Sequence, residues 1–134
     1  GRAIDAVART TLRHSIEVGE HLLHTDVPES LGGSASGPEP HDLFDAALGA
    51  CKALTLMLHA KQRGLPLDSL DVHLVRDDSQ ERQGTYRLAV ELDLHGALDD
   101  EQRQQLLRIA DKCPIHKLMT NVEVQVETRL SEGA

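Results

Sequence analysis

The sequence predicts a single α+β domain, covering residues 1–134, with the element order β-β-β-α-β-β-α-β. The length of 134 residues is typical of one domain. Several short segments alternate apolar and polar residues, which indicates strands. Two longer segments repeat apolar residues at i, i+3 and i+4, which indicates helices packed on one apolar face.

Composition excludes several classes of function. The chain has 14 Lys and Arg against 22 Asp and Glu, a net charge of −8, so phosphate backbones repel it and nucleic acid is not an expected partner. The only aromatic residues are Phe44 and Tyr86, too few for the stacking platforms of single-strand binders. No uninterrupted apolar run reaches the length of a bilayer, so no transmembrane helix and no membrane partner are expected.

The N-terminal third of the chain alternates apolar and polar positions. Residues 3–9, 12–18 and 21–25 are the expected strands, with Gly19-Glu20 as a tight turn between the second and the third. Residues 28–40 are rich in Gly, Pro and Ser and are expected to form a loop. Loops of this length within a compact domain are often functional.

The strongest helix pattern covers residues 43–63. Asp42 is the expected N-cap, and Gly64 and Pro66 are typical of a helix end. The helix is apolar around nearly its whole circumference, which is typical of a helix enclosed by other elements. In so small a domain, we expect a second copy of the chain to help cover it, which predicts a homodimer.

The second half of the chain repeats the pattern of strands followed by a helix. Residues 71–77 and 86–94 predict a hairpin. Asp99 and Gln102 form a capping-box pair at the start of the next helix, which Pro114 should end or kink near Cys113. The alternation of apolar residues over 122–130 predicts a final strand.

The two cysteines, Cys51 and Cys113, are too few for a disulfide scaffold, and this favours a reducing, cytoplasmic setting. Cys51 lies mid-helix on an apolar stripe, where a core thiol is usually inert. Cys113 precedes Pro114 at an irregular helix end, where we expect better solvent access. Spacing alone leaves both residues open to two interpretations, as core filling or as reactive thiols.

A metal site is a third interpretation of the sequence and the least favoured. The chain has eight histidines, and Cys113 with His116, and His21 with His24, have short ligand-like spacings. The further pairs that complete a Cys/His zinc site are absent. We therefore expect no metal ligands, and no hydrolase, nucleotide-binding or metalloprotease motif is present.

Three segments resemble the OsmC/Ohr family of osmotically inducible and organic hydroperoxide resistance proteins. GPEPHDLFDAALGACKALTLMLHAKQRGLPL is similar to the family's cysteine-helix signature, and IADKCPIHKLM to its Cys-Pro segment. HLLHTDVPESLGG resembles the OsmC-like branch rather than true Ohr proteins. The resemblance extends over essentially the whole chain.

The resemblance implies an intertwined homodimer with central cysteine-bearing helices. It also implies a thiol peroxidase that reduces small organic peroxides, with Cys51 as the peroxidatic thiol and Cys113 as the resolving thiol. No resident cofactor is implied. The resemblance implies that an external dithiol, of lipoyl type or another small dithiol, restores the thiols by exchange.

The sequence departs from the Ohr pattern near the first cysteine. Ohr proteins carry a Glu ten residues before that cysteine, whereas this chain has His41 there. His41 and Asp42 are the weaker site candidates: His41 either shares a proton with the thiol or is a loop residue, and Asp42 either replaces the Glu or, as we favour, caps the helix. Arg9 and Arg13 are alternative matches for the arginine that the Glu orients.

Lys52 follows Cys51 directly, but on an ideal helix it points about 100° away. Because these features weaken the match to Ohr, a second function stays open. The alternative is a non-catalytic dimeric protein that binds a small hydrophobic molecule and carries sensor or relic cysteines.

Overall fold

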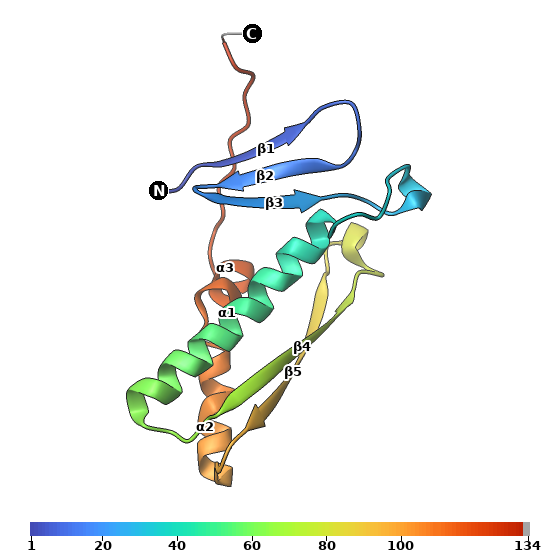
Figure 1. The fold of residues 1–134 in the computed structure, drawn as a ribbon. Coiled ribbons are helices and arrows are strands. Elements are labelled where there is room, and N and C mark those ends of the chain that lie inside the picture. Colours follow the sequence, from blue (N-terminus) through green and yellow to red (C-terminus); the bar gives the residue numbers. More distant parts are fainter. Residues whose placement is uncertain (133–134) are drawn as a thin grey trace. The chain divides into compact units, whose positions relative to one another are not determined.

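The computed structural model describes residues 1–132 and has an α+β architecture (Figure 1). In chain order its elements are β1 (Ile4–Ala8), β2 (His14–Val18), β3 (His21–Thr25), α1 (Pro40–Arg63), β4 (Ser69–Asp77), β5 (Arg87–His95), α2 (Asp100–Ala110) and α3 (Pro114–Thr120). The expected α+β class is confirmed. The last two residues of the expected domain, 133 and 134, lie outside the described residues.

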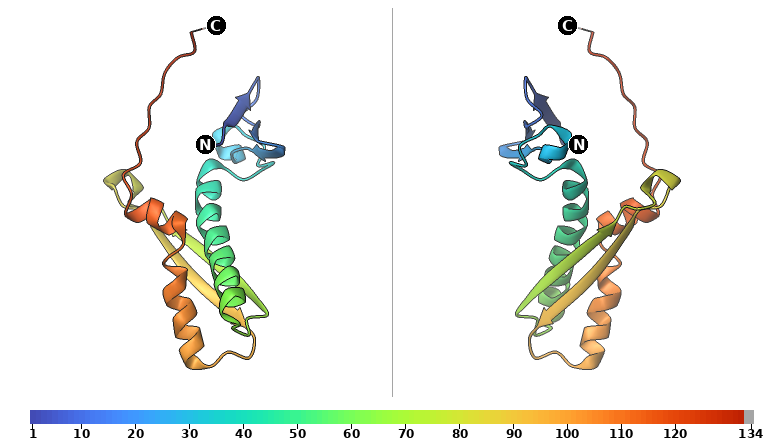
Figure 2. Two further views of the ribbon diagram at one scale, coloured as in Figure 1. Left: turned by 90° about the vertical axis from the view of Figure 1, so that its left-hand side faces the viewer. Right: turned by 90° about the vertical axis from the view of Figure 1, so that its right-hand side faces the viewer.

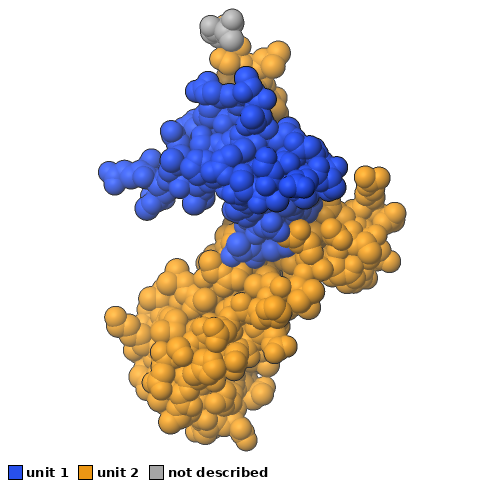
Figure 3. Space-filling view, turned by 45° about the vertical axis from the view of Figure 1, so that its right-hand side comes forward, with its two compact units in different colours: residues 1–46 blue, residues 47–134 orange. Residues whose placement is uncertain are grey.

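The chain forms two compact units, residues 1–46 and residues 47–134 (Figure 3). The first contains β1, β2, β3 and the start of α1. The second contains the rest of α1 together with β4, β5, α2 and α3, and both cysteines belong to it.

The first unit is a three-stranded antiparallel sheet in the order β1-β2-β3. Ile16 is at its centre and pairs with Ala6 on one side and Leu23 on the other. Gly19 adopts a φ of 59° between β2 and β3, a left-handed conformation that glycine adopts readily. The three N-terminal strands expected from alternation are therefore confirmed, with boundaries shifted by a few residues.

The loop after β3 is folded around the carboxylate of Asp26, which is almost fully buried. This carboxylate accepts hydrogen bonds from the backbone N–H groups of Val27, Ser34 and Ser36 and from the Ser36 hydroxyl. These hydrogen bonds, led by that of the Ser36 hydroxyl, lower the pKa of Asp26 to about 2. Residues 26–38 are thus an anchored loop rather than a loose connection.

Helix α1 begins three residues earlier than the sequence predicts. Pro40 is its first residue, a position that suits proline because the first helical N–H groups have no partner within the helix. Asp42 is therefore not the N-cap. It lies in the first turn, and its carboxylate accepts the backbone N–H of Glu39 at 3.0 Å, so it still caps the helix, from within the first turn.

The second unit packs two helices against a long hairpin (Figure 2). β4 and β5 pair antiparallel over nine residues each, and half-buried and exposed positions alternate strictly along both strands. The buried cluster joins α1, α2 and the segment before β4 and consists of Leu56, Ala60, Leu67, Leu106 and Ala110, with Leu70, Leu92 and Leu94 of the hairpin packed against it. The core is aliphatic, as the composition requires.

The expected capping box at α2 is confirmed. The Asp99 carboxylate accepts the backbone N–H of Gln102 at 2.8 Å, and the Gln102 side chain accepts the backbone N–H of Asp99 at 3.0 Å. The helix ends at Ala110, and a separate helix, α3, begins at Pro114. Proline ends the first helix and begins the second because it restricts the residue before it to extended geometry.

The strand expected over residues 122–130 is not present. This segment has no regular secondary structure, and its apolar residues are largely exposed, with Val126 82% exposed. A strand requires a hydrogen-bonded neighbour, and neither β-sheet of the described chain pairs with this segment. The sequence of this segment thus alternates as a strand does, but no described strand lies beside it to form the hydrogen bonds of a sheet.

Helix α1 meets a length and composition criterion for a membrane span. Its 24 residues include an 18-residue window with a mean hydropathy of 1.3, long and apolar enough to cross a membrane. The core helices of globular proteins meet the same criterion, so length and composition alone do not distinguish the two cases. The absence of a transmembrane helix therefore stays a prediction from the sequence.

Candidate active site around the two cysteines

Cys51 lies in the middle of α1 and is half-buried. Its Sγ is 4.0 Å from the hydroxyl oxygen of Thr55, one turn further along the helix. Leu54 and Leu58 share this face of the helix by their spacing and are about half exposed or more. The thiol is therefore only partly buried, and its apolar neighbours are those that the sequence predicts.

Cys113 is fully buried, which corrects the expectation of better access at this position. It is the N-cap of α3, and its Sγ accepts the backbone N–H of His116 at 3.3 Å. The irregular backbone before Pro114 does not expose the thiol. Instead, it directs the side chain inward, because an N-cap side chain turns back toward the first N–H groups of its helix.

The structure brings the two cysteines together from positions 62 residues apart. Both are free thiols, and Cys51 is near enough to Cys113 to influence its pKa. Burial raises the pKa of Cys113, and the hydrogen bond and charge of Cys51 raise it further. The site thus pairs an accessible thiol with a buried thiol that resists ionisation.

Lys52 is a part of this site that the sequence analysis set aside. It is only 2% exposed. Its ammonium donates to the carbonyl oxygen of Ala110 at 2.8 Å and lies 3.0 Å from Nδ1 of His116 and 3.5 Å from Oδ1 of Asp111. A helical wheel directs Lys52 away from Cys51 but says nothing of how far a flexible side chain reaches. The signal in the sequence is a lysine on an otherwise apolar helix.

His41 and Asp42 belong to the first unit. The His41 ring lies 3.5 Å from the Glu39 carboxylate, and Asp42 accepts the Glu39 backbone N–H. Both described partners are therefore at the start of α1 itself. Of the two interpretations left open for Asp42, the structure describes the helix-capping one.

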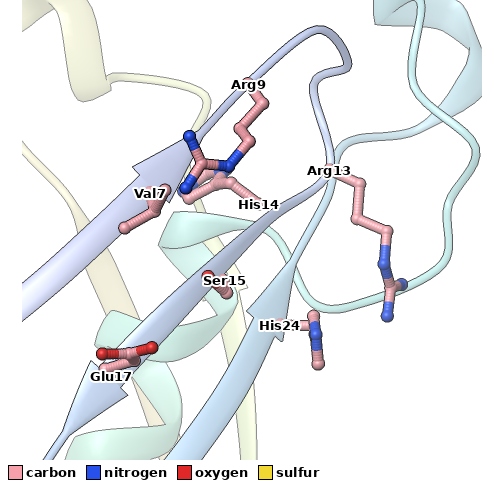
Figure 4. Close-up of a pocket in the computed structure, with 7 residues that line it drawn as sticks. All are labelled: Val7, Arg9, Arg13, His14, Ser15, Glu17 and His24. Atoms are coloured by element: carbon pink, nitrogen blue, oxygen red, sulfur yellow. The ribbon is translucent and has the colours of Figure 1, made fainter.

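The two candidate arginines also belong to the first unit, where they line a cavity of about 310 Å³ (Figure 4). Arg13 donates to the carbonyl oxygen of Ser36 at 2.9 Å and to its hydroxyl at 2.7 Å. It therefore helps to hold the loop that is folded around Asp26. The other residues that line this cavity are Val7, Arg9, His14, Ser15, Glu17 and His24.

The two ligand-like spacings in the sequence do not form a metal site. His21 and His24 are an odd number of residues apart on β3, so their side chains lie on opposite faces of the sheet. His116 is engaged by Lys52, whose ammonium repels a cation. Among residues 1–132, the side chains that could share an ion are the exposed group Asp71, Asp93 and His95 on the hairpin.

The chain is similar in structure to several solved proteins. An OsmC-like protein from Mycoplasma pneumoniae aligns with a TM-score of 0.76 and 17% identity, over 91% of this chain and 89% of that chain. The organic hydroperoxide resistance protein OsmC from Legionella pneumophila aligns with a TM-score of 0.62 and 22% identity, over 89% and 90%. OhrB of Bacillus subtilis, an organic hydroperoxide resistance protein, gives 0.58 and 24%, over 89% and 91%.

These likenesses show the fold. A comparison with curated protein sequences finds no significant match. The sequence does match a protein-family model, that of the OsmC-like proteins, over residues 33–129. The match includes α1, the hairpin, α2 and both cysteines, and it confirms the resemblance noted in the sequence. The chain therefore belongs to the OsmC-like protein family.

Proposed function

We propose that this chain is a two-cysteine thiol peroxidase that reduces organic hydroperoxides in defence against oxidative stress. Family membership supports a redox role in peroxide stress. The observation that supports the finer proposal is the pairing of a half-buried thiol, Cys51, with a fully buried thiol, Cys113, whose pKa Cys51 influences. That arrangement suits one cysteine that meets the oxidant and a second that closes a disulfide.

In the first step the Cys51 thiolate attacks an oxygen of the hydroperoxide. The O–O bond breaks, the sulfur gives up an electron pair and becomes a sulfenic acid, and the alkoxide takes up a proton and leaves as an alcohol. Leu54 and Leu58 lie on the same helix face as Cys51 and are 61% and 48% exposed. Burial of an organic tail against them would favour organic peroxides over hydrogen peroxide.

In the second step the Cys113 thiolate attacks the sulfur of the Cys51 sulfenic acid. An S–S bond forms, the S–O bond breaks, and the hydroxide leaves as water after taking up a proton. An external dithiol, for which we propose a lipoyl-type carrier, then reduces the disulfide by two exchange steps and becomes a disulfide itself. The cycle needs no resident cofactor or metal, and we place it in the reducing cytoplasm.

We also propose that the working form is a homodimer. Residues 122–130 alternate apolar and polar side chains, and Val124 and Val126 are 63% and 82% exposed. Leu54 of α1 is exposed as well. A second copy that pairs with the segment and covers the helix would bury both sets of side chains and enclose the peroxide site.

The dimer is tested by sedimentation or light scattering of the full chain at micromolar concentration. We expect the mass of two chains, and Val124→Asp should shift it toward one. Glu127→Gln is the matched control, because this side chain is exposed and would lie on the opposite face from Val124 in the proposed strand. A mass of one chain for the wild type would contradict the proposal.

The peroxidase is tested by intact-mass measurement after one equivalent of cumene hydroperoxide. The wild type should lose about two hydrogens per chain as the disulfide forms. Cys51→Ser should abolish this change. Cys113→Ser should instead gain one or two oxygens on Cys51, because no second thiol intercepts the sulfenic acid.

A different result would favour the binding-protein alternative. The proposal fails if the wild type stays reduced while an alkylating agent modifies Cys51 readily, because accessibility without oxidation describes a thiol that is not peroxidatic. Hydrogen peroxide in a parallel reaction measures the preference for an organic tail. We expect slower oxidation by hydrogen peroxide, since it has no apolar group to bury.

A further inference from the structure

Lys52 is a buried charge close to the thiol pair. Its ammonium contacts the carbonyl oxygen of Ala110, the last residue of α2, and Nδ1 of His116 in α3. The backbone N–H of the same His116 donates to Sγ of Cys113. The Lys52 side chain thus contacts the helix before Cys113, α2, and the helix after it, α3.

We propose that Lys52 is a positioning residue for the resolving thiol, which holds the turn between α2 and α3 in place and supports the Cys113 thiolate by its charge. The inference deepens the proposed peroxidase and rests on it for its role in the cycle. Lys52 is neither the glutamate nor the arginine that the Ohr pattern places near the first cysteine, so this role is separate from theirs.

The electrostatic argument follows from the groups that face Cys113. Burial and the neighbouring Cys51 thiol of α1 raise the pKa of Cys113. The His116 N–H of α3 and the Lys52 charge lower it. Lys52 is the cationic side chain among these groups, and charges interact more strongly in a poorly hydrated interior than in water. Two further ionisable groups border Lys52: the His116 ring at 3.0 Å and the exposed carboxylate of Asp111 at 3.5 Å, which partly offsets the charge of Lys52.

This role matters for disulfide closure. Cys113 must lose its proton before it attacks the Cys51 sulfenic acid, and its complete burial opposes that ionisation. A fixed ammonium compensates in part, and it does so without any solvent access to the resolving thiol. The accessible thiol can then react with peroxide while the second thiol stays shielded from it.

The test measures Cys113 alone, in a Cys51→Ser background, by following the ultraviolet absorbance of the thiolate as a function of pH. Adding Lys52→Met, which removes the charge and keeps most of the side-chain length, should raise the pKa of Cys113. We expect a shift of about one unit, a tenfold loss of thiolate at a fixed pH below the transition. Lys61→Met on the same helix is the matched control, because Lys61 is exposed.

A second variant covers the case in which Lys52→Met does not fold. Asp111→Asn removes an exposed carboxylate 3.5 Å from the ammonium and leaves Lys52 in place. It should lower the pKa of Cys113, the opposite direction, because the Lys52 charge is no longer offset. An unchanged pKa of Cys113 in Asp111→Asn would overturn the proposal, because neither the carboxylate nor the ammonium 3.5 Å from it would then influence the thiol.

These titrations require no peroxide, so they separate the two proposals. If cumene hydroperoxide fails to oxidise the wild type while the Cys113 titration moves as expected, the peroxidase proposal fails and the electrostatic role of Lys52 stands. In a working peroxidase, Lys52→Met should slow disulfide closure at neutral pH by about tenfold, with a smaller loss at higher pH. An equal loss at every pH would contradict the charge-based role.

Discussion

The hydroxyl of Ser36 lies 2.5 Å from the Oδ2 carboxylate oxygen of Asp26 and donates a hydrogen bond to it. The same hydroxyl accepts a hydrogen bond from Arg13 in the segment before β2. These two hydrogen bonds connect the segment before β2 to the loop after β3. Because the network ends at the negative charge of Asp26, the stability that it gives the loop should depend on pH.

We expect the stabilising effect of Asp26 to disappear at low pH. The pKa of Asp26 is lowered from 3.8 to about 2 in the folded state, chiefly by the Ser36 hydroxyl. Stability gained from the ionised form is thus complete above the unfolded value and is lost as pH falls through the folded value. Asp26→Asn should lower the thermal midpoint most above pH 4, and hardly at all near pH 2.

Circular dichroism melts across this pH range check the prediction. Asp5→Asn is the control, because Asp5 is an exposed residue of β1. A difference between the wild type and Asp26→Asn that stays constant down to pH 2 would show that the carboxylate charge does not hold the loop.

Gly96 should be far less tolerant of alanine than Gly64. Both glycines have positive φ, of 146° and 66°. A Cβ at Gly64 would meet open space, whereas a Cβ at Gly96 would overlap the carbonyl oxygen of Pro66, which is backbone and cannot turn away. Gly64→Ala should cost about 1–2 kcal/mol for the left-handed conformation alone. Gly96→Ala should cost clearly more in urea-induced unfolding, and equal costs would contradict the overlap.

Leu106 and Leu107 provide a matched pair for the core of the second unit. Leu106 is fully buried between α1, α2 and the hairpin, whereas its neighbour Leu107 is 51% exposed. Leu106→Ala should destabilise the protein by about 2–5 kcal/mol, because it removes buried methyl groups and leaves a cavity. Leu107→Ala should cost much less, and chemical denaturation of both variants measures the contrast. Similar losses would indicate that a second copy buries Leu107.

His95 should titrate above its ordinary value of 6.5. Its Nε2 lies 3.0 Å from the Asp71 carboxylate across the hairpin, and this hydrogen bond raises the pKa of His95, with a further contribution from the charge of Asp93. Because the folded pKa is the higher one, the stabilisation is complete below 6.5 and is lost as pH rises through the folded value.

An NMR titration of the His95 ring checks this prediction. Asp71→Asn should lower the pKa of His95 more than Asp93→Asn does, since the hydrogen bond to Asp71 is the larger cause. The reverse order would place the main interaction at Asp93 instead.

Features that depend on neighbours in the sequence could be predicted. The capping box of Asp99 and Gln102 involves residues three apart, so its pattern is complete within one turn. Strands β1 to β5, the two longer helices and the placement of Cys51 within α1 follow from periodicity in the same way. Even Asp42 was placed correctly at the start of α1, although it caps from within the helix rather than from before it.

Features that depend on packing between segments far apart in the sequence could not be predicted. The burial of Cys113 follows from how α3 turns its N-cap inward, whereas the sequence shows only a proline that interrupts a helix. Lys52 was discounted by its helical angle, yet its partners Ala110 and His116 lie about 60 residues further along the chain. The alternation over residues 122–130 predicts a strand, but neither sheet of the described chain pairs with this segment.

The contact between Lys52 and His116 also determines the chemistry of the histidine ring. An ammonium group has only donors, so Nδ1 of His116 accepts at 3.0 Å and carries no proton of its own. The neutral imidazole is thereby restricted to the tautomer protonated at Nε2. The second ring nitrogen, Nε2, is then an N–H donor, suited to contact an oxyanion rather than to remove a proton.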